Sequence, residues 1–117
     1  MKIQRLMLLL GAWTFVFPSL AAATSQYIRN TTVTYVEAGW AGEGMALHLA
    51  TPAVSNGCPS GSNLTDFAIA SSHPSYAEEV TLLYIAYVKK KTITVVIEDT
   101  ACAFGNRSSV TSIQLSQ

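Results

Sequence analysis

The side chains best suited to acid–base chemistry in this chain are its two histidines, His48 and His73. A hydrolase also needs a nucleophile and an orienting group within reach of the base. Serine and threonine are plentiful, but His48 alternates with two leucines, which predicts that its ring faces solvent or a neighbouring subunit. His73 precedes Pro74 at the start of an expected helix, where a local role beside the helix cap is favoured. The segment 57–61, Gly-Cys-Pro-Ser-Gly, places its serine wrongly for a nucleophile elbow.

Acidic side chains could supply the carboxylate pair of a glycosidase. Glu78 and Glu79 fall in the first turn of the expected helix, where the helix dipole stabilises negative charge. Glu98 and Asp99 end a strand at a turn. Neither pair lies in a context that requires catalysis, so we predict that the chain is not an enzyme. No cofactor or metal is predicted, because two cysteines and two distant histidines do not have a zinc-ligand spacing.

Binding residues are more plausible in this sequence than catalytic ones. Trp40 lies in a glycine-rich turn, where an exposed indole would offer a sugar-stacking surface or a subunit contact. Folding of this indole over the end of a barrel is the alternative. Tyr35 and His48, on the strands before and after the turn, complete the predicted binding set. The lysines at 89–91 could contact an anion, but a solvated helix end explains them more simply.

One helix is predicted to begin near Pro74, a residue that suits the first turn. Ser75 and Glu78 have the spacing of a capping box. At 3.6 residues per turn, one apolar face is predicted, and its members are Tyr76, Val80, Leu83, Tyr84 and Tyr87. The lysines at 89–91 then place positive charge at the negative end of the helix dipole.

Five strands are predicted around this helix. Residues 27–37 are β-branched and aromatic, residues 45–49 alternate as a half-buried second strand antiparallel to the first, and 64–69 form a third strand. After the helix, 92–97 and 110–115 form the fourth and fifth strands. The loops at 51–62 and 101–109 hold Cys58 and Cys102. The order β-β-β-α-β-β favours a five-stranded, OB-fold-like, partly open barrel, with an α+β sandwich as the alternative.

The first 23 residues have the organisation of a secretory signal peptide. Lys2 and Arg5 precede an apolar run of about a dozen residues, too short to span a bilayer, and Ala21–Ala23 predict cleavage after Ala23. Residues 24–117 then form a single exported domain, periplasmic or extracellular, with no membrane span in the mature chain. Its formal net charge of −2 does not suit nucleic-acid binding. An oxidising compartment favours a disulfide between Cys58 and Cys102.

The segment Pro-Ser-Tyr-Ala-Glu-Glu-Val-Thr-Leu-Leu-Tyr-Ile-Ala-Tyr-Val-Lys-Lys-Lys-Thr-Ile-Thr-Val-Val-Ile, flanked by the two cysteines, resembles a known family. It is similar to the B-subunit-like OB-folds of bacterial AB5 toxins of the subtilase-cytotoxin and pertussis-like kind, and to small secreted bacterial proteins that share this core. The resemblance covers roughly residues 31–115. It implies a secreted OB-fold with a disulfide and, in the toxin branch, a ring pentamer that binds sialylated glycans. Those B subunits have extra cysteines and loop length, so the position of their sugar site is not carried over.

These observations together predict a secreted, non-enzymatic binding module, used alone or as a homo-oligomer. A glycan or another protein would be its partner. The alternative is a stand-alone periplasmic or surface protein with a structural or protein-inhibitory role and no small ligand.

Overall fold

The computed structural model describes residues 25–58 and 64–116 of the chain. Within them lie six strands, one helix and two short 3-10 turns. In chain order these are β1 (Ser25–Thr31), β2 (Val33–Ala38), η1 (Trp40–Gly42), β3 (Gly44–Leu49), β4 (Asp66–Ala70), α1 (Tyr76–Lys89), β5 (Ile93–Ala103), η2 (Phe104–Asn106) and β6 (Arg107–Leu115). The predicted signal peptide and part of the predicted 51–62 loop lie outside the described residues.

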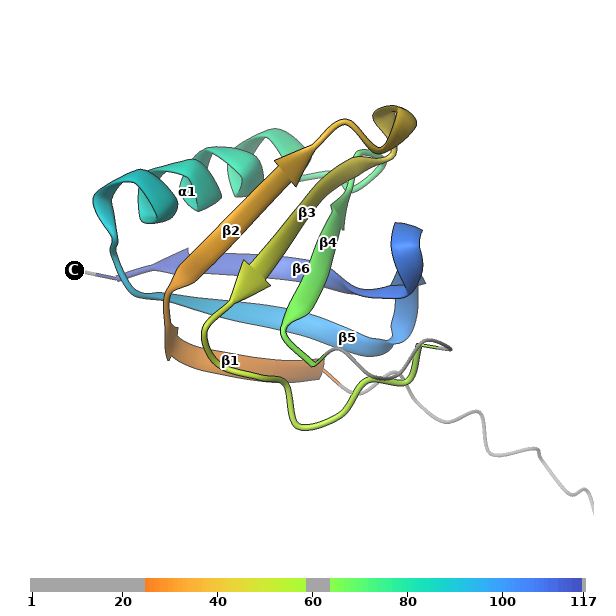
Figure 1. Ribbon diagram of the computed structural model, residues 1–117, viewed down its shortest axis with the longest axis horizontal. Helices are drawn as coiled ribbons and strands as arrows, with labels where there is room; N and C mark the ends of the chain where they lie inside the picture. Colours follow the sequence, from red (N-terminus) through yellow and green to blue (C-terminus); the bar gives the residue numbers. More distant parts are fainter. Residues whose placement is uncertain (1–24, 59–63, 117) are drawn as a thin grey trace, which may run out of the picture.

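The strands form one mixed sheet in the order β1-β5-β6-β4-β3-β2. All neighbouring pairs are antiparallel except β4 and β6, which are parallel. Figure 1 shows β2, β3 and β4 slanting across β1, β5 and β6, with α1 packed along one side. The prediction of a mainly β fold with one helix between the third and fourth predicted strands is confirmed.

The first predicted strand, residues 27–37, is divided in two, which makes six strands where five were predicted. Asn30 has a φ of 52°, and the strand register shifts between Ile28 and Thr31 and again between Val33 and Tyr35. Asparagine tolerates this left-handed conformation better than most residues. The chain therefore turns at this point, so that β1 pairs with β5 while β2 pairs with β3.

The prediction of a half-buried second strand is wrong, because β3 is buried on both faces. Its inward residues Met45, Leu47 and Leu49 belong to the apolar core, as predicted. Ala46 points to the opposite, outward face and is still only 1% exposed. The turn η2 reaches this face, since the Phe104 ring would lie 2.9 Å from a Cβ on Gly44. Phe104, from a turn distant in the sequence, thus packs at the Gly44 end of a face that the alternation pattern assigns to solvent.

The predicted helix is confirmed, but its buried face differs from the predicted one. Leu83 and Ala86 are buried against the sheet, whereas Tyr84 and Tyr87 are exposed. The apolar stripe is therefore rotated toward residues 76, 79, 80, 83 and 86. Because nearly every residue between 80 and 88 is apolar, the sequence pattern alone does not fix which face contacts the sheet.

The predicted capping box is wrong, because Ser75 is the N-cap but makes no side-chain cap bond. Instead, the Ser75 backbone N–H donates to Nδ1 of His73 at 3.0 Å. His73 thus has the local role beside the cap that was predicted for it. The same Nδ1 lies 3.7 Å from Oε2 of Glu79, which is 4% exposed.

Glu79 is a buried carboxyl group, and among the described residues neither of its oxygens has a hydrogen-bond partner. Burial raises the pKa of Glu79, Glu78 adds to this effect, and His73 partly offsets it. A carboxyl group whose pKa is raised on folding binds its proton more tightly in the folded state. The folded state is therefore disfavoured at pH values above that pKa and regains stability as the pH falls through it.

We expect Glu79→Gln to raise the free energy of unfolding by about 1–3 kcal/mol near neutral pH, because it removes a buried, poorly paired charge. The gain over the original chain should shrink as the pH falls toward about 4, where the carboxyl group is protonated in both states. Denaturant titrations across this pH range measure both effects. Glu78→Gln, at the exposed neighbouring position, serves as the control. A loss of stability in Glu79→Gln at neutral pH would contradict the expectation.

The predicted disulfide is present between Cys58 and Cys102, with 5.6 Å between the Cα atoms. Cys102 lies within β5, which continues to Ala103, so the predicted loop at 101–109 is mostly strand. Hydrogen bonds to Asp99 also hold the segments beside this disulfide together. Gly57 N–H donates to the Asp99 carbonyl at 2.8 Å, and Gln26 Nε2 donates to the Asp99 carboxylate at 3.2 Å. The bridge thus ties the β3–β4 connection to the far end of β5.

Candidate functional site

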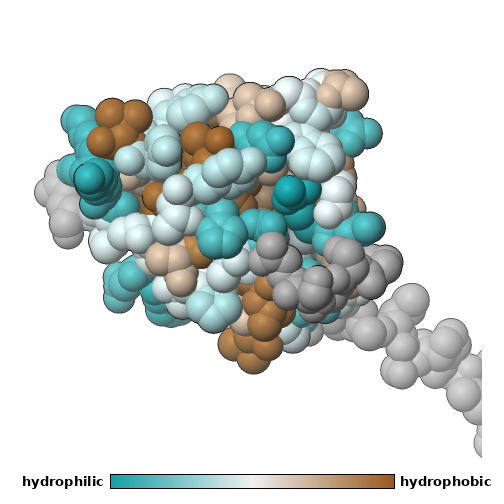
Figure 2. Space-filling view, viewed as in Figure 1, coloured by the Kyte–Doolittle hydropathy of each residue, from teal (hydrophilic) through white to brown (hydrophobic). Residues whose placement is uncertain are grey.

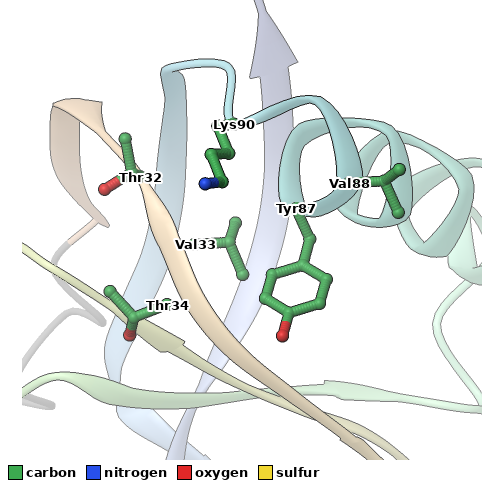
Figure 3. A pocket seen from close by; sticks show the side chains of 6 residues that line it. All are labelled: Thr32, Val33, Thr34, Tyr87, Val88 and Lys90. Atoms are coloured by element: carbon green, nitrogen blue, oxygen red, sulfur yellow. The ribbon is translucent and has the colours of Figure 1, made fainter.

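A groove lies between the C-terminal end of α1 and strand β2. Its volume is about 550 Å³, within the range of small-ligand sites. The groove is lined by Thr32, Val33, Thr34, Tyr87, Val88 and Lys90. In Figure 3, the Val33 side chain of β2 lies on the side of the strand that faces Lys90 and Tyr87, whereas the Thr32 and Thr34 side chains are drawn on its other side.

Backbone geometry at both walls places these side chains. Thr32 is the residue between β1 and β2, where the chain changes direction. On the other wall, Lys90 caps α1 in the left-handed conformation with a φ of 52°. The Lys91 N–H then donates to the Ala86 carbonyl at 3.0 Å, which ends the helix and turns the chain toward β5. The helix end and the strand break therefore meet at one place.

The chemistry of the groove is that of a hydroxyl-rich, positively charged recess. Lys90 is the one charged residue among its lining residues, and Thr32 and Tyr87 contribute hydroxyl groups. Val33 and Val88 supply apolar walls. A ligand with a negative charge, several hydroxyl groups and a small apolar face would be matched by these groups.

The hydroxyl of Thr34 is already engaged by His48, one of the predicted binding residues. Thr34 Oγ1 lies 2.7 Å from His48 Nδ1 and donates to the His48 carbonyl at 3.1 Å. On the other side of the ring, Nε2 lies 2.6 Å from Thr65 Oγ1 and 3.7 Å from Asp66 Oδ1. His48 therefore links β2 to the start of β4, and it holds the groove residue Thr34 by a hydrogen bond.

Thr34, Thr65 and Asp66 around His48 include the residue types of a hydrolase triad, but they do not have the hydrogen bonds of one. In such a triad, the carboxylate bonds one ring nitrogen and the nucleophile bonds the other. Here Nε2 is bonded by Thr65, and Asp66 lies beyond hydrogen-bond distance. The arrangement is that of a structural clamp.

Trp40, the second predicted binding residue, packs against other side chains of the turns. Its ring lies 5.5 Å from the Phe104 ring, and the Arg107 guanidinium lies over it at 4.7 Å. The indole remains 37% exposed. It therefore packs on η2 with part of its ring exposed, and its proposed role in binding stays a prediction.

Tyr35, the third predicted residue, lies directly opposite His48 in the pairing of β2 with β3. Its hydroxyl donates to Glu37 Oε2 at 2.6 Å. This hydrogen bond raises the pKa of Tyr35, with burial and the Glu37 charge adding to the effect and Arg107 opposing it. Tyr35 and His48 thus share the outward face of the sheet, away from the groove.

The groove was missed by sequence reasoning, apart from the suggestion that the lysines at 89–91 contact an anion. Tyr87 was assigned to the core because it falls on the predicted apolar face. Thr32 carries no signal of its own, since it looks like any other residue of a β-branched strand. The meeting of these positions depends on the break between β1 and β2, which the sequence pattern did not reveal.

Comparison with protein-family models and with curated proteins gives no match for this chain. No protein-family model matches it, and no curated protein is significantly similar to it. In the part that the structure describes, no helix has the length and apolar character required to cross a membrane. Within that same part, no three His, Cys, Asp or Glu side chains gather in a way that could hold a metal ion.

Proposed function

We propose that this protein is a secreted, non-enzymatic binding module that takes an acidic glycan in the groove between α1 and β2. The observation that carries the proposal is the composition of the groove, where Lys90 and two hydroxyl groups lie beside apolar walls. The ammonium group would pair with a sugar carboxylate, and the hydroxyl groups of Thr32 and Tyr87 would bond sugar hydroxyls. The resemblance to toxin B subunits makes sialylated glycans the first ligands to test.

We further propose that the sheet is an OB-fold barrel. In support, β1 and β2 are consecutive in the chain, yet they occupy the two outermost positions of the sheet. Taken as one bent strand, they would pair with β5 at one end and β3 at the other, which gives five strands in a nearly closed sheet. The parallel pair β4–β6 and the helix between β4 and β5 fit the same topology.

Export to an oxidising compartment is part of the same proposal. The disulfide between Cys58 and Cys102 supports it, because such bridges persist mainly outside the cytosol. The charged start, apolar run and alanines of residues 1–23 are the second support.

We expect Lys90→Gln to weaken binding of sialyllactose by about tenfold or more, because a hydrogen bond to a charged group contributes roughly 1.5–3 kcal/mol. Lys89→Gln is the matched control, since it removes the same charge from the preceding residue, which is not among the lining residues of the groove. Calorimetric titration with sialyllactose and with lactose measures both the affinity and its dependence on the carboxylate. Equal losses in the two variants, or no preference for sialyllactose over lactose, would contradict the proposed site.

Self-association is supported by the large apolar side chains that α1 exposes, Tyr84, Tyr87 and Val88. Val88 is 74% exposed and Tyr84 and Tyr87 are 42% and 41% exposed, while the charged Glu78 and Lys89 are exposed near the two ends of the helix. A shallow hollow of about 380 Å³ lies beside Leu82 on the same helix. Figure 2 shows some hydrophobic residues, in brown, among hydrophilic ones over the part of the surface where α1 lies. Exposed apolar patches of this kind mark contact surfaces.

The alternative function is a stand-alone structural or inhibitory protein. The exposed surface of α1 supports this function too, because it could contact another protein. Native mass measurement separates the two. A ring of several protomers that binds glycan favours the B-subunit-like function, because repeated sites raise a weak sugar affinity through avidity. A monomer that binds neither sialylated nor neutral glycans favours the alternative.

A further inference from the structure

Arg107, the first residue of β6, is held in a fixed orientation at the end of the sheet where η1 and η2 meet. Its guanidinium stacks over the Trp40 ring at 4.7 Å, and Trp40 in turn packs on Phe104. Gly105 borders the same group so closely that an added Cβ would collide with Nη1 of Arg107. An aromatic ring on one side and backbone on another restrict the plane of the guanidinium.

Apart from its stacking on Trp40, Arg107 forms no ion pair with a carboxylate of the described residues. Its Nε is buried without a hydrogen-bond acceptor. Of the carboxylates on the same outward face, Glu37 accepts the Tyr35 hydroxyl at 2.6 Å. The guanidinium therefore has at least one N–H, that of Nε, whose hydrogen-bonding capacity is unused among the described residues.

We propose that Arg107 is the anchor of a second binding site, one that takes the carboxylate of a small acidic ligand. The planar fork of arginine matches a carboxylate in a bidentate geometry. Stacking on Trp40 already restricts the Arg107 side chain, so less conformational entropy is lost when a ligand binds. The exposed parts of Trp40 and Tyr35, at 37% and 45%, offer apolar contact to the rest of the ligand. The neighbouring carboxylates limit the affinity, so a dissociation constant of about 1 mM is expected for a single carboxylate.

This site is independent of the groove proposed for glycan binding. Arg107 and Trp40 belong to β6 and η1, whereas the groove is lined by residues of α1 and β2 and the chain immediately beside them. The two sites share no lining residue. The failure of one therefore leaves the other unaffected, and variants at each can be compared in the same protein.

Two sources of the carboxylate are to be distinguished, an acidic sugar and an acidic amino acid. Glucuronate and N-acetylglutamate are the probes, with glucose and N-acetylglutamine as their uncharged counterparts. Titrations followed by ¹H–¹⁵N NMR report on the site directly through the Nε–H signal of Arg107 and the indole N–H signal of Trp40. We expect at least one acidic probe to shift both signals, and its uncharged counterpart to shift neither.

Variants test the role of the guanidinium. Arg107→Gln is expected to weaken binding of the acidic probe at least tenfold, and Arg107→Lys should lose nearly as much, because lysine keeps the charge but not the planar fork. Arg29→Gln is the matched control, since Arg29 also stacks on an aromatic ring, Tyr27, at 4.7 Å. Dispersed amide spectra verify that each variant is folded. Unshifted Arg107 signals with both acidic probes, or affinity unchanged in Arg107→Lys, would overturn the proposal.

Discussion

Gly44→Ala is expected to destabilise the protein by about 4 kcal/mol or more, the range reached by severe steric conflicts in a core. Gly44 has a φ of 149°, and an added Cβ would lie 2.0 Å from the backbone carbonyl oxygen of Ile69. That atom belongs to β4, whose Ala70 pairs directly with Gly44. The backbone cannot yield without separating β3 from β4 at the end where Phe104 packs.

Gly42→Ala is the matched control for this effect. Gly42 also has a positive φ, of 80°, but an added Cβ there meets nothing within 4 Å. Only the conformational cost of a left-handed residue remains, about 1–2 kcal/mol. Denaturant unfolding of both variants, or circular dichroism if Gly44→Ala does not fold, measures the difference. Equal losses in the two variants would show that the contact with Ile69 is not the cause.

Removing the disulfide with the double change Cys58→Ala and Cys102→Ala is expected to cost about 4 kcal/mol in the free energy of unfolding. The bridge joins positions 44 residues apart, and the chain-entropy model gives this magnitude for a loop of such length. Cys58 is also buried at 3% exposure, so its loss leaves unfilled space in the core. Unfolding curves of the oxidised protein and the double variant provide the measurement.

A reductant supplies the control for the bridge. Reduction should lower the stability of the original chain to nearly that of the double variant and leave the double variant unchanged. The contacts of Gly57 and Gln26 with Asp99 persist without the bridge, so the native fold should still form near room temperature. A loss below about 1 kcal/mol would mean that these contacts, and not the covalent link, hold the junction.

The helix shows which structural features of this protein can be predicted from sequence patterns and which cannot. Its existence and its C-terminal end at Lys89 follow from apolar periodicity and from the lysines at the end of the dipole. Its N-terminal cap did not follow, because Nδ1 of His73 accepts the hydrogen bond from the Ser75 N–H that the Glu78 side chain would accept in a capping box. Its orientation also did not follow, because apolar residues surround most of the helix. Burial of Glu79 and exposure of Tyr87 were decided by packing against the sheet.

For the candidate sites too, some features were predictable from the sequence and others were not. Tyr35, Trp40 and His48 were singled out by residue type and by their place around a glycine-rich turn, and Tyr35 and His48 do lie opposite each other on one face. What each side chain contacts was not predictable. Trp40 depends on Phe104 and Arg107, which come from a distant part of the chain. Residue type suggests what a side chain can bind, but its partners are set by the pairing of strands far apart in sequence.

The amino-acid sequence by itself determined the helix, the approximate places of most strands and the covalent bridge of this protein, because periodicity, β-branched runs and two cysteines are local or countable properties. Only the tertiary structure decided that the first β segment is split between the two edges of the sheet. It also decided that the break at Thr32 faces Lys90. The physical reason is that strand pairing and helix orientation minimise the exposure of the whole apolar core, a quantity to which every segment contributes and which no single segment reveals.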